Sequence, residues 1–272
     1  MALLGNLYKK YPNQILGDDN FKIAQPHNTD WLYDWFKDRI NHNMNVLALY
    51  VGGTGSGKSY SALSTALMWD PDFPVENIVF TVKDFMATMA NMHKGDVIVF
   101  DDAGLGVSAK DWRDQQVRIF GKVVQSFRYK NLITLMTTPD LTFIETTSRK
   151  LLNILFQASE LEQGLFYPKI PYTPKNYTLR NINTYFAYPR YVYNGVKYKA
   201  TKIHFPLIPE KIADAYESRK AEFIEQYYAT YREAVNKTGA GGAGDVKERH
   251  KKRMSPNSLA NLRQNRNKKE SE

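Results

Sequence analysis

Eight consecutive residues of this chain have the composition and spacing of a phosphate-binding loop. Residues 52–59 read GGTGSGKS, a full match to the pattern G-x-x-x-x-G-K-[ST]. Glycines let backbone N–H groups close around phosphate oxygens where a side chain would clash. We expect the Lys58 ammonium group to reach the β- and γ-phosphates, and the Ser59 hydroxyl group to bind Mg²⁺. The residues predicted to bind the nucleotide are Gly52, Gly53, Thr54, Gly55, Ser56, Gly57, Lys58, Ser59 and Tyr60.

A second group of candidate residues follows a short apolar run. Residues 97–100 read VIVF, and Asp101 and Asp102 come directly after them. Carboxylates at the carboxyl end of a buried strand lie at the edge where open α/β sheets bind ligands. We expect Asp101 to hold Mg²⁺, through water, and Asp102 to polarise the attacking water beside the γ-phosphate. The alternative is two ordinary acids at a strand end, just as residues 52–59 have the alternative of a glycine-rich turn with a chance lysine.

Two further side chains are candidates for phosphoryl-transfer chemistry. Thr138 ends an apolar run over residues 132–137, where a hydroxyl group can sense the γ-phosphate or orient water. A pair of threonines that simply ends a strand explains the same residues equally well. Arg149 is a candidate for charge compensation in the transition state, and the alternative is a surface arginine.

The elements around these residues must place them at one sheet edge. Residues 46–51 have the character of a buried strand, and the residues after Ser59 predict a helix with Leu63, Ala66 and Leu67 on its apolar face. A strand, a glycine-rich turn and a helix N-terminus form the setting that this phosphate motif requires. The positive end of the helix dipole adds to the attraction for phosphate.

The order of these motifs resembles the additional-strand ATPases of the P-loop class, which include AAA+ proteins, RecA-like motors and FtsK/HerA pumps. The residues that carry the resemblance are GGTGSGKS, VIVFDDAG, LITLMTTP and Arg149. More closely, they resemble P-loop ATPases of archaeal plasmids and viruses, and the amino-terminal domain of Zot-type phage proteins. The resemblance covers residues 44–165.

The resemblance implies ATP and Mg²⁺ as cofactors, with the metal at Ser59 and Asp101. It also implies a sensor at Thr138 and an arginine at Arg149 that acts in its own or a neighbouring subunit, which suggests a homo-oligomeric ring, commonly a hexamer. Asp102 departs from the family pattern, which has glutamate there. Its carboxylate is set back by about 1.5 Å, so Asp140 or Glu145 becomes a candidate helper.

Composition and charge bear on the location of the protein and on its partners. The chain has 272 residues, 43% of them hydrophobic, and no cysteine. No apolar run reaches the ~20 residues needed to cross a bilayer, so we expect a cytoplasmic protein without an integral membrane segment. The net charge is +9, and residues 246–272 contribute nine Lys or Arg against three Glu. A basic tail of this kind predicts DNA as a partner, and the alternative is a solubilising tail.

The predicted fold class is α/β, a P-loop NTPase core with a mainly parallel sheet flanked by helices. Behind the core we expect a β-hairpin at Asn194-Gly195, a helix over residues 210–236 and a disordered basic tail. The predicted divisions are residues 1–43 (N-terminal extension and helix), 44–165 (ATPase core), 166–238 (hairpin and helix appendage) and 239–272 (Gly-rich linker and tail).

The expected function is an ATPase of a mobile genetic element that couples hydrolysis to DNA translocation, packaging or remodelling. One alternative is a Zot-like virion-assembly or secretion ATPase, and another is an ATP-switch DNA-binding protein for replication or transcription control. A GTPase is disfavoured because the chain has no Asn-Lys-x-Asp guanine motif. A nucleotide kinase is disfavoured because no arginine-rich lid follows the core.

Overall fold

The computed structural model describes residues 21–101, 129–143, 149, 151–172, 185–229 and 232. Asp102, Glu145 and the predicted basic tail over residues 239–272 lie outside the described residues. The chain divides into two compact units, residues 1–218 and residues 219–272. All contacts of the candidate site discussed below lie within the first unit.

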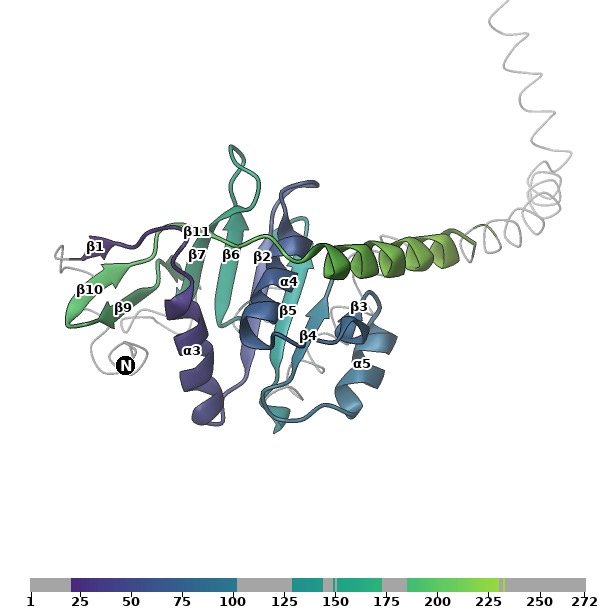
Figure 1. Ribbon diagram of the computed structural model, residues 1–272, viewed down its shortest axis with the longest axis horizontal. Coiled ribbons are helices and arrows are strands. Elements are labelled where there is room, and N and C mark those ends of the chain that lie inside the picture. The colour runs from purple at the N-terminus through teal and green to yellow at the C-terminus, as the bar shows by residue number, and fades with distance from the viewer. Residues whose placement is uncertain are drawn as a thin grey trace, which may run out of the picture. The chain divides into compact units, whose positions relative to one another are not determined.

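A mixed sheet forms the centre of the molecule (Figure 1). Its strand order is β11-β7-β6-β2-β5-β4-β3, and β8 pairs with β7 beside it. The bounds are β2 Val46–Val51, β3 Ile78–Val79, β4 Val97–Phe100, β5 Ile133–Thr138, β6 Ile154–Ala158, β7 Leu165–Tyr172, β8 Tyr185–Ala187 and β11 Ile203–His204. Strands β3, β4, β5, β2 and β6 are parallel to one another, whereas β7 runs antiparallel to β6, β8 and β11.

The strand that leads into the phosphate loop and the strand that ends at Asp101 are not neighbours in the sheet. β5 lies between β2, which leads into the loop, and β4, which ends at the acidic pair. Because all three strands are parallel, their carboxyl ends meet at one edge of the sheet. The predicted α/β class, with a largely parallel sheet flanked by helices, is confirmed. β7 crosses the predicted boundary at residues 165/166, so the sheet extends into the next division.

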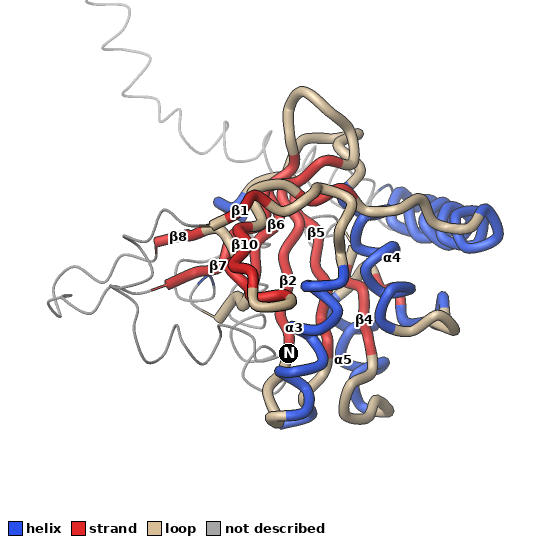
Figure 2. The backbone as a smooth tube through the Cα atoms, turned by 60° about the vertical axis from the view of Figure 1, so that its left-hand side comes forward, coloured by secondary structure: helices blue, strands red, loops and turns tan. Residues whose placement is uncertain are grey.

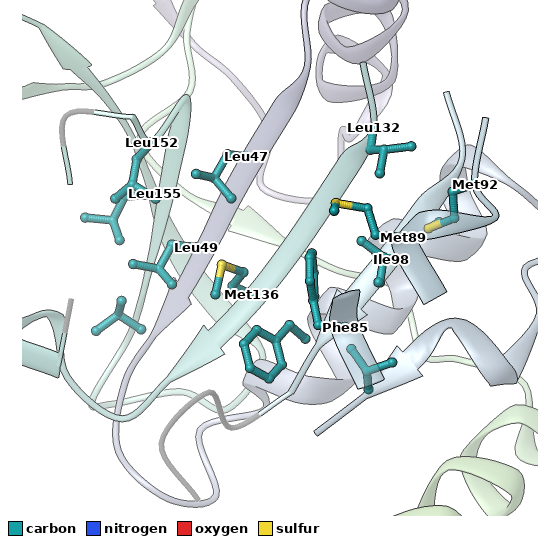
Figure 3. Packing of buried hydrophobic residues seen from close by; sticks show 13 residues of the cluster. Leu47, Leu49, Phe85, Met89, Met92, Ile98, Leu132, Met136, Leu152 and Leu155 are labelled. Carbon is teal, nitrogen blue, oxygen red and sulfur yellow. The ribbon is translucent and has the colours of Figure 1, made fainter. Parts of the chain in front are cut away.

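Helices lie on both faces of the sheet, since alternate residues of a buried strand point to opposite sides (Figure 2). On one face, Tyr50 of β2 shares a 2.6 Å hydroxyl contact with Thr65 of α4 (Lys58–Trp69). Burial raises the pKa of Tyr50, so this hydroxyl group stays protonated. On the other face, Leu49 belongs to an apolar cluster with Phe85 and Met89 of α5 (Val82–Ala90), shown in Figure 3.

The helix expected within residues 1–43 is α3 (Asp30–Asn41), which buries a stripe of aromatic and aliphatic residues. Residues 77–82 have the sequence character of a strand, but only Ile78 and Val79 pair. Thr81 instead caps α5, where its hydroxyl oxygen accepts a 3.0 Å hydrogen bond from the backbone N–H of Asp84. Two 3₁₀ turns complete the set, η1 (Val75–Asn77) and η2 (Leu141–Phe143).

A second, three-stranded sheet contains the predicted hairpin. Its order is β1-β10-β9, with β1 Lys22–Ile23, β9 Arg190–Tyr193 and β10 Val196–Lys199. Asn194 and Gly195 have φ angles of 48° and 77°, the left-handed values that a type I′ turn requires. The hairpin at Asn194-Gly195 is therefore confirmed. Residues 210–229 then form a helix, drawn in green in Figure 1. None of the helices among the described residues combines the length and apolar character needed to cross a membrane.

Candidate nucleotide-binding site

The glycines of the loop serve two different needs. Gly57 has φ 87° and directly precedes α4, a conformation that a residue with a Cβ atom rarely adopts. Gly52 lies so close to β6 that an added Cβ atom would stand 2.4 Å from Ala158 Cβ and 2.9 Å from Ser56 Oγ. The loop is therefore a tight turn, with its backbone packed against the end of β6.

Lys58 is held inside the loop. It is the first residue of α4, its side chain is only 7% exposed, and its Nζ atom donates a 2.7 Å hydrogen bond to the Gly53 carbonyl oxygen. The Ser56 hydroxyl group lies at 3.5 Å from the same nitrogen. The cation thus spans the turn from the inside, where the phosphates of a nucleotide held by the loop would approach it.

The two predicted metal ligands are in contact. The Ser59 hydroxyl group donates a 2.6 Å hydrogen bond to Asp101 Oδ1, although 42 residues separate them in the sequence. Asp101 is completely buried at the end of β4. The glycine loop and the acidic strand end therefore share one edge of the sheet, as a common nucleotide–metal site requires.

Two hydroxyl groups that the sequence analysis did not assign also reach this carboxylate. Thr137 of β5 donates a 2.8 Å hydrogen bond to Asp101 Oδ1. Tyr216, from the helix over residues 210–229, donates a 2.7 Å hydrogen bond to Oδ2. The sequence feature that separates Thr137 from Thr138 is the alternation of side chains along a strand, because adjacent residues point to opposite faces of the sheet. Tyr216 was not among the predicted site residues.

Thr138, the predicted sensor, lies beside Thr137 but contacts a different group. Its hydroxyl group donates a 3.2 Å hydrogen bond to the Asp140 backbone oxygen, and its own carbonyl oxygen accepts one from the Gly52 N–H at 3.4 Å. Thr138 therefore ties the end of β5 to the start of the phosphate loop. Of the threonine pair, Thr137 is the residue whose hydroxyl group reaches the acidic centre.

A cavity of about 510 Å³ opens beside the loop. Its lining consists of Val51, residues 52–56 of the loop, Pro139 and Asp140 after β5, and residues 157–163 from β6 and its turn. The turn also supports the loop directly. Gln163 Nε2 donates to the Gly55 carbonyl oxygen at 2.8 Å, and the Gly164 N–H donates to the Ser56 carbonyl oxygen at 3.2 Å. The β6–β7 connection is therefore part of the site.

Asp140 lines this cavity but is poorly suited to be a base. Hydrogen bonds from the Thr142 side chain and backbone N–H lower its pKa, and the positive charge of Arg149 adds to the effect. A carboxylate with a lowered pKa accepts a proton from water less readily than an ordinary one. Arg149 is therefore close enough to Asp140 for its charge to be felt, although it is not among the residues that line the cavity. Asp102, the other candidate base, lies outside the described residues.

Tyr60 contacts the helix over residues 210–229. It is 38% exposed, and its hydroxyl group donates a 3.0 Å hydrogen bond to Glu217 Oε1. This hydrogen bond joins α4 to that helix.

The donor set around Asp101 suits magnesium. A serine hydroxyl oxygen and a carboxylate oxygen are hard ligands of the kind Mg²⁺ takes, with water and phosphate oxygens completing its octahedron. Among the described residues no group of three or more His, Cys, Asp or Glu could hold a metal ion. Two protein oxygens, from Ser59 and Asp101, leave the other positions of a Mg²⁺ octahedron to water and phosphate oxygens.

The strand order, the loop and the Ser59–Asp101 contact together are those of a P-loop NTPase-like fold. No family model matches the sequence, and no curated protein matches it. Among solved structures, the chain is similar to the N-terminal domain of zonular occludens toxin from Neisseria meningitidis. The TM-score is 0.32 and the identity 14%, over 54% of this chain and 95% of that domain.

Two further solved structures are similar over a larger share of this chain. They are EccC of Thermomonospora curvata (ATPases 2 and 3, with a signal sequence peptide), at TM-score 0.21 and 10% identity, and EssC of Geobacillus thermodenitrificans (ATPases 2 and 3), at 0.22 and 7%. The matches cover 73% and 77% of this chain but only 40% and 44% of those chains. At such low TM-scores the fold assignment depends on the sheet order and loop geometry described above.

Proposed function

We propose that this protein is an ATPase of the additional-strand P-loop class that uses hydrolysis to translocate, package or remodel DNA. The observation that carries the nucleotide assignment is the contact between Ser59 and Asp101, on a sheet in which β5 separates β2 from β4. The placement of Lys58 and of the open cavity supports it. ATP is favoured over GTP because the chain has no guanine motif.

Each group of residues in the site has its own proposed role. The backbone of residues 52–59 and the Lys58 ammonium group bind and orient the phosphates. Ser59 and Asp101 would hold Mg²⁺, which would supply positive charge to offset that of the phosphates. Asp102 is proposed to orient the attacking water, and Arg149 to offset charge in its own or a neighbouring subunit.

The proposal of DNA as partner depends on charge. Residues 246–272 hold nine Lys or Arg against three Glu, which is two thirds of the net charge of +9. The small sheet adds basic residues: the Arg190 guanidinium group is 4.8 Å from the Phe21 ring centroid and Lys197 Nζ is 5.8 Å from it. A run of positive charge such as that of residues 246–272 suits the phosphate backbone of nucleic acid. A mobile-element context and a cytoplasmic location are part of the same proposal.

The decisive experiment measures ATP hydrolysis with and without double-stranded DNA, together with the mass of the protein in solution. A motor is expected to hydrolyse ATP several-fold faster with DNA and to assemble as a closed ring. Slow turnover with ATP-dependent DNA affinity would instead identify a switch protein. Hydrolysis that DNA leaves unchanged would contradict the DNA-coupled proposal, and the absence of any hydrolysis would contradict the ATPase itself.

Removing residues 246–272 is expected to weaken DNA binding and make it less dependent on salt. Each phosphate contact contributes about −0.9 to the slope of log K against log salt concentration, so a net charge of +6 contributes up to about −5. The measurement is a DNA-binding isotherm at several salt concentrations. The matched control keeps the tail length and replaces its nine Lys and Arg by Gln. Equal DNA affinity and equal salt dependence for the wild type, the truncated protein and the Gln variant would indicate that the tail is only solubilising.

A further inference from the structure

A tyrosine from outside the phosphate-binding region reaches its acidic centre. Tyr216 lies in the helix over residues 210–229, 115 residues after Asp101, and is only 2% exposed. Its hydroxyl group donates a 2.7 Å hydrogen bond to Asp101 Oδ2. A buried phenol aimed at a buried carboxylate does more than fill space, because each group satisfies the other where water has no access.

Ring packing holds this hydroxyl group in place. The Tyr216 ring meets Tyr60 of α4 edge-on at 5.9 Å between centroids, and Phe80, which follows β3, at 6.5 Å. The next residue, Glu217, accepts the 3.0 Å hydrogen bond from Tyr60. Residues 216 and 217 thus fasten the helix to the first turn of α4, directly after the predicted metal ligand Ser59.

The two oxygens of Asp101 have different neighbours. Oδ1 accepts hydrogen bonds from Ser59 and Thr137, on the side of the phosphate loop and β5, whereas Oδ2 accepts one from Tyr216. The bond at Oδ2 fixes the rotation of the carboxylate about its axis and keeps Oδ1 directed at Ser59. Outer partners of a metal-binding carboxylate orient it, and their loss typically costs 10–100-fold in metal affinity or activity.

We propose that Tyr216 is a positioning residue for the metal-binding carboxylate, which acts through its hydrogen bond to Asp101 Oδ2. This inference rests on the proposed nucleotide function. The opposite arrangement is a tyrosine that competes with the metal's water shell for Asp101 and so inhibits the site. The two arrangements predict changes of opposite sign when the hydroxyl group is removed.

The test is Tyr216→Phe, which removes the hydroxyl group and keeps the packed ring. Binding of a fluorescent ATP analogue is measured while Mg²⁺ is titrated, so the readout does not require turnover. The expected result is that half-maximal Mg²⁺-dependent binding needs about 10-fold more Mg²⁺ than in the wild type. Binding of the analogue in excess EDTA is expected to stay unchanged, because the phosphate loop itself is untouched.

Glu217→Ala provides the matched control. It removes a hydrogen bond between the same helix and the core without touching Asp101, and is expected to leave the Mg²⁺ requirement at the wild-type value. An unchanged requirement in Tyr216→Phe, a lower one, or an equal rise in both variants would overturn the positioning role. If the wild-type protein binds no nucleotide, the proposed function fails as well; if it binds and only the Tyr216 result is negative, this inference alone fails.

Discussion

Replacing Lys58 by alanine is expected to lower nucleotide affinity and turnover by about 100-fold or more. The Lys58 ammonium group lies inside the turn of residues 52–59, donates to the Gly53 carbonyl oxygen and is 7% exposed. A cation held in a shielded position stabilises phosphate charge far more than one in open water. The measurement is binding of a fluorescent ATP analogue, followed by the rate of phosphate release.

The control for Lys58→Ala is Lys83→Ala, which removes an equal charge from an exposed position on α5. It is expected to bind and hydrolyse ATP as the wild type does. A thermal melt of both variants without nucleotide tests whether the fold is retained. Wild-type binding by a folded Lys58→Ala variant would remove the nucleotide site from residues 52–59.

The second large effect is expected for Asp101→Asn, which should reduce Mg²⁺-dependent hydrolysis by about 100-fold or more. Asparagine keeps the shape but not the negative charge that a divalent cation needs. Its amide oxygen can accept the hydrogen bonds of Ser59 and Thr137, and its NH₂ group can donate to the Tyr216 oxygen. The fold should therefore survive, so that the loss can be assigned to the metal.

Hydrolysis by Asp101→Asn is measured across a Mg²⁺ titration, and analogue binding is measured in excess EDTA. The EDTA binding is expected to match that of the wild type, since the phosphate loop is intact. Asp72→Asn, at an exposed position before β3, is the control and should keep normal hydrolysis. A wild-type Mg²⁺ profile for Asp101→Asn would place the metal elsewhere.

The parts of the fold that could be predicted are those encoded by local sequence. The six-residue strand β2 matches its predicted bounds because every residue of it is buried and apolar or aromatic. The Asn194-Gly195 turn follows from backbone preference alone. The phosphate loop could be predicted from two local features together, a buried strand before it and glycines within it.

Contacts between distant residues could not be derived in this way. β3 has only two paired residues, and its pairing with β4 is a tertiary contact that hydrophobic pattern does not encode. The choice of Thr137 over Thr138 depends on which face of the sheet each side chain points to, and Thr137 shares the face of Asp101. Tyr216 reaches Asp101 only because the helix returns to the sheet edge after 115 residues, although Ile212 and Tyr216 share a helix face in the sequence.

Because the sheet continues past residue 165, the choice of end point matters when the protein is shortened. A fragment that stops at residue 165 would lose β7 and expose the hydrogen-bonding edge of β6. An exposed strand edge of this kind favours aggregation. It would also lack Tyr216. A fragment that keeps β7, β11 and the tyrosine must extend at least to Tyr216, so residues 44–165 and the appendage are better expressed as one piece.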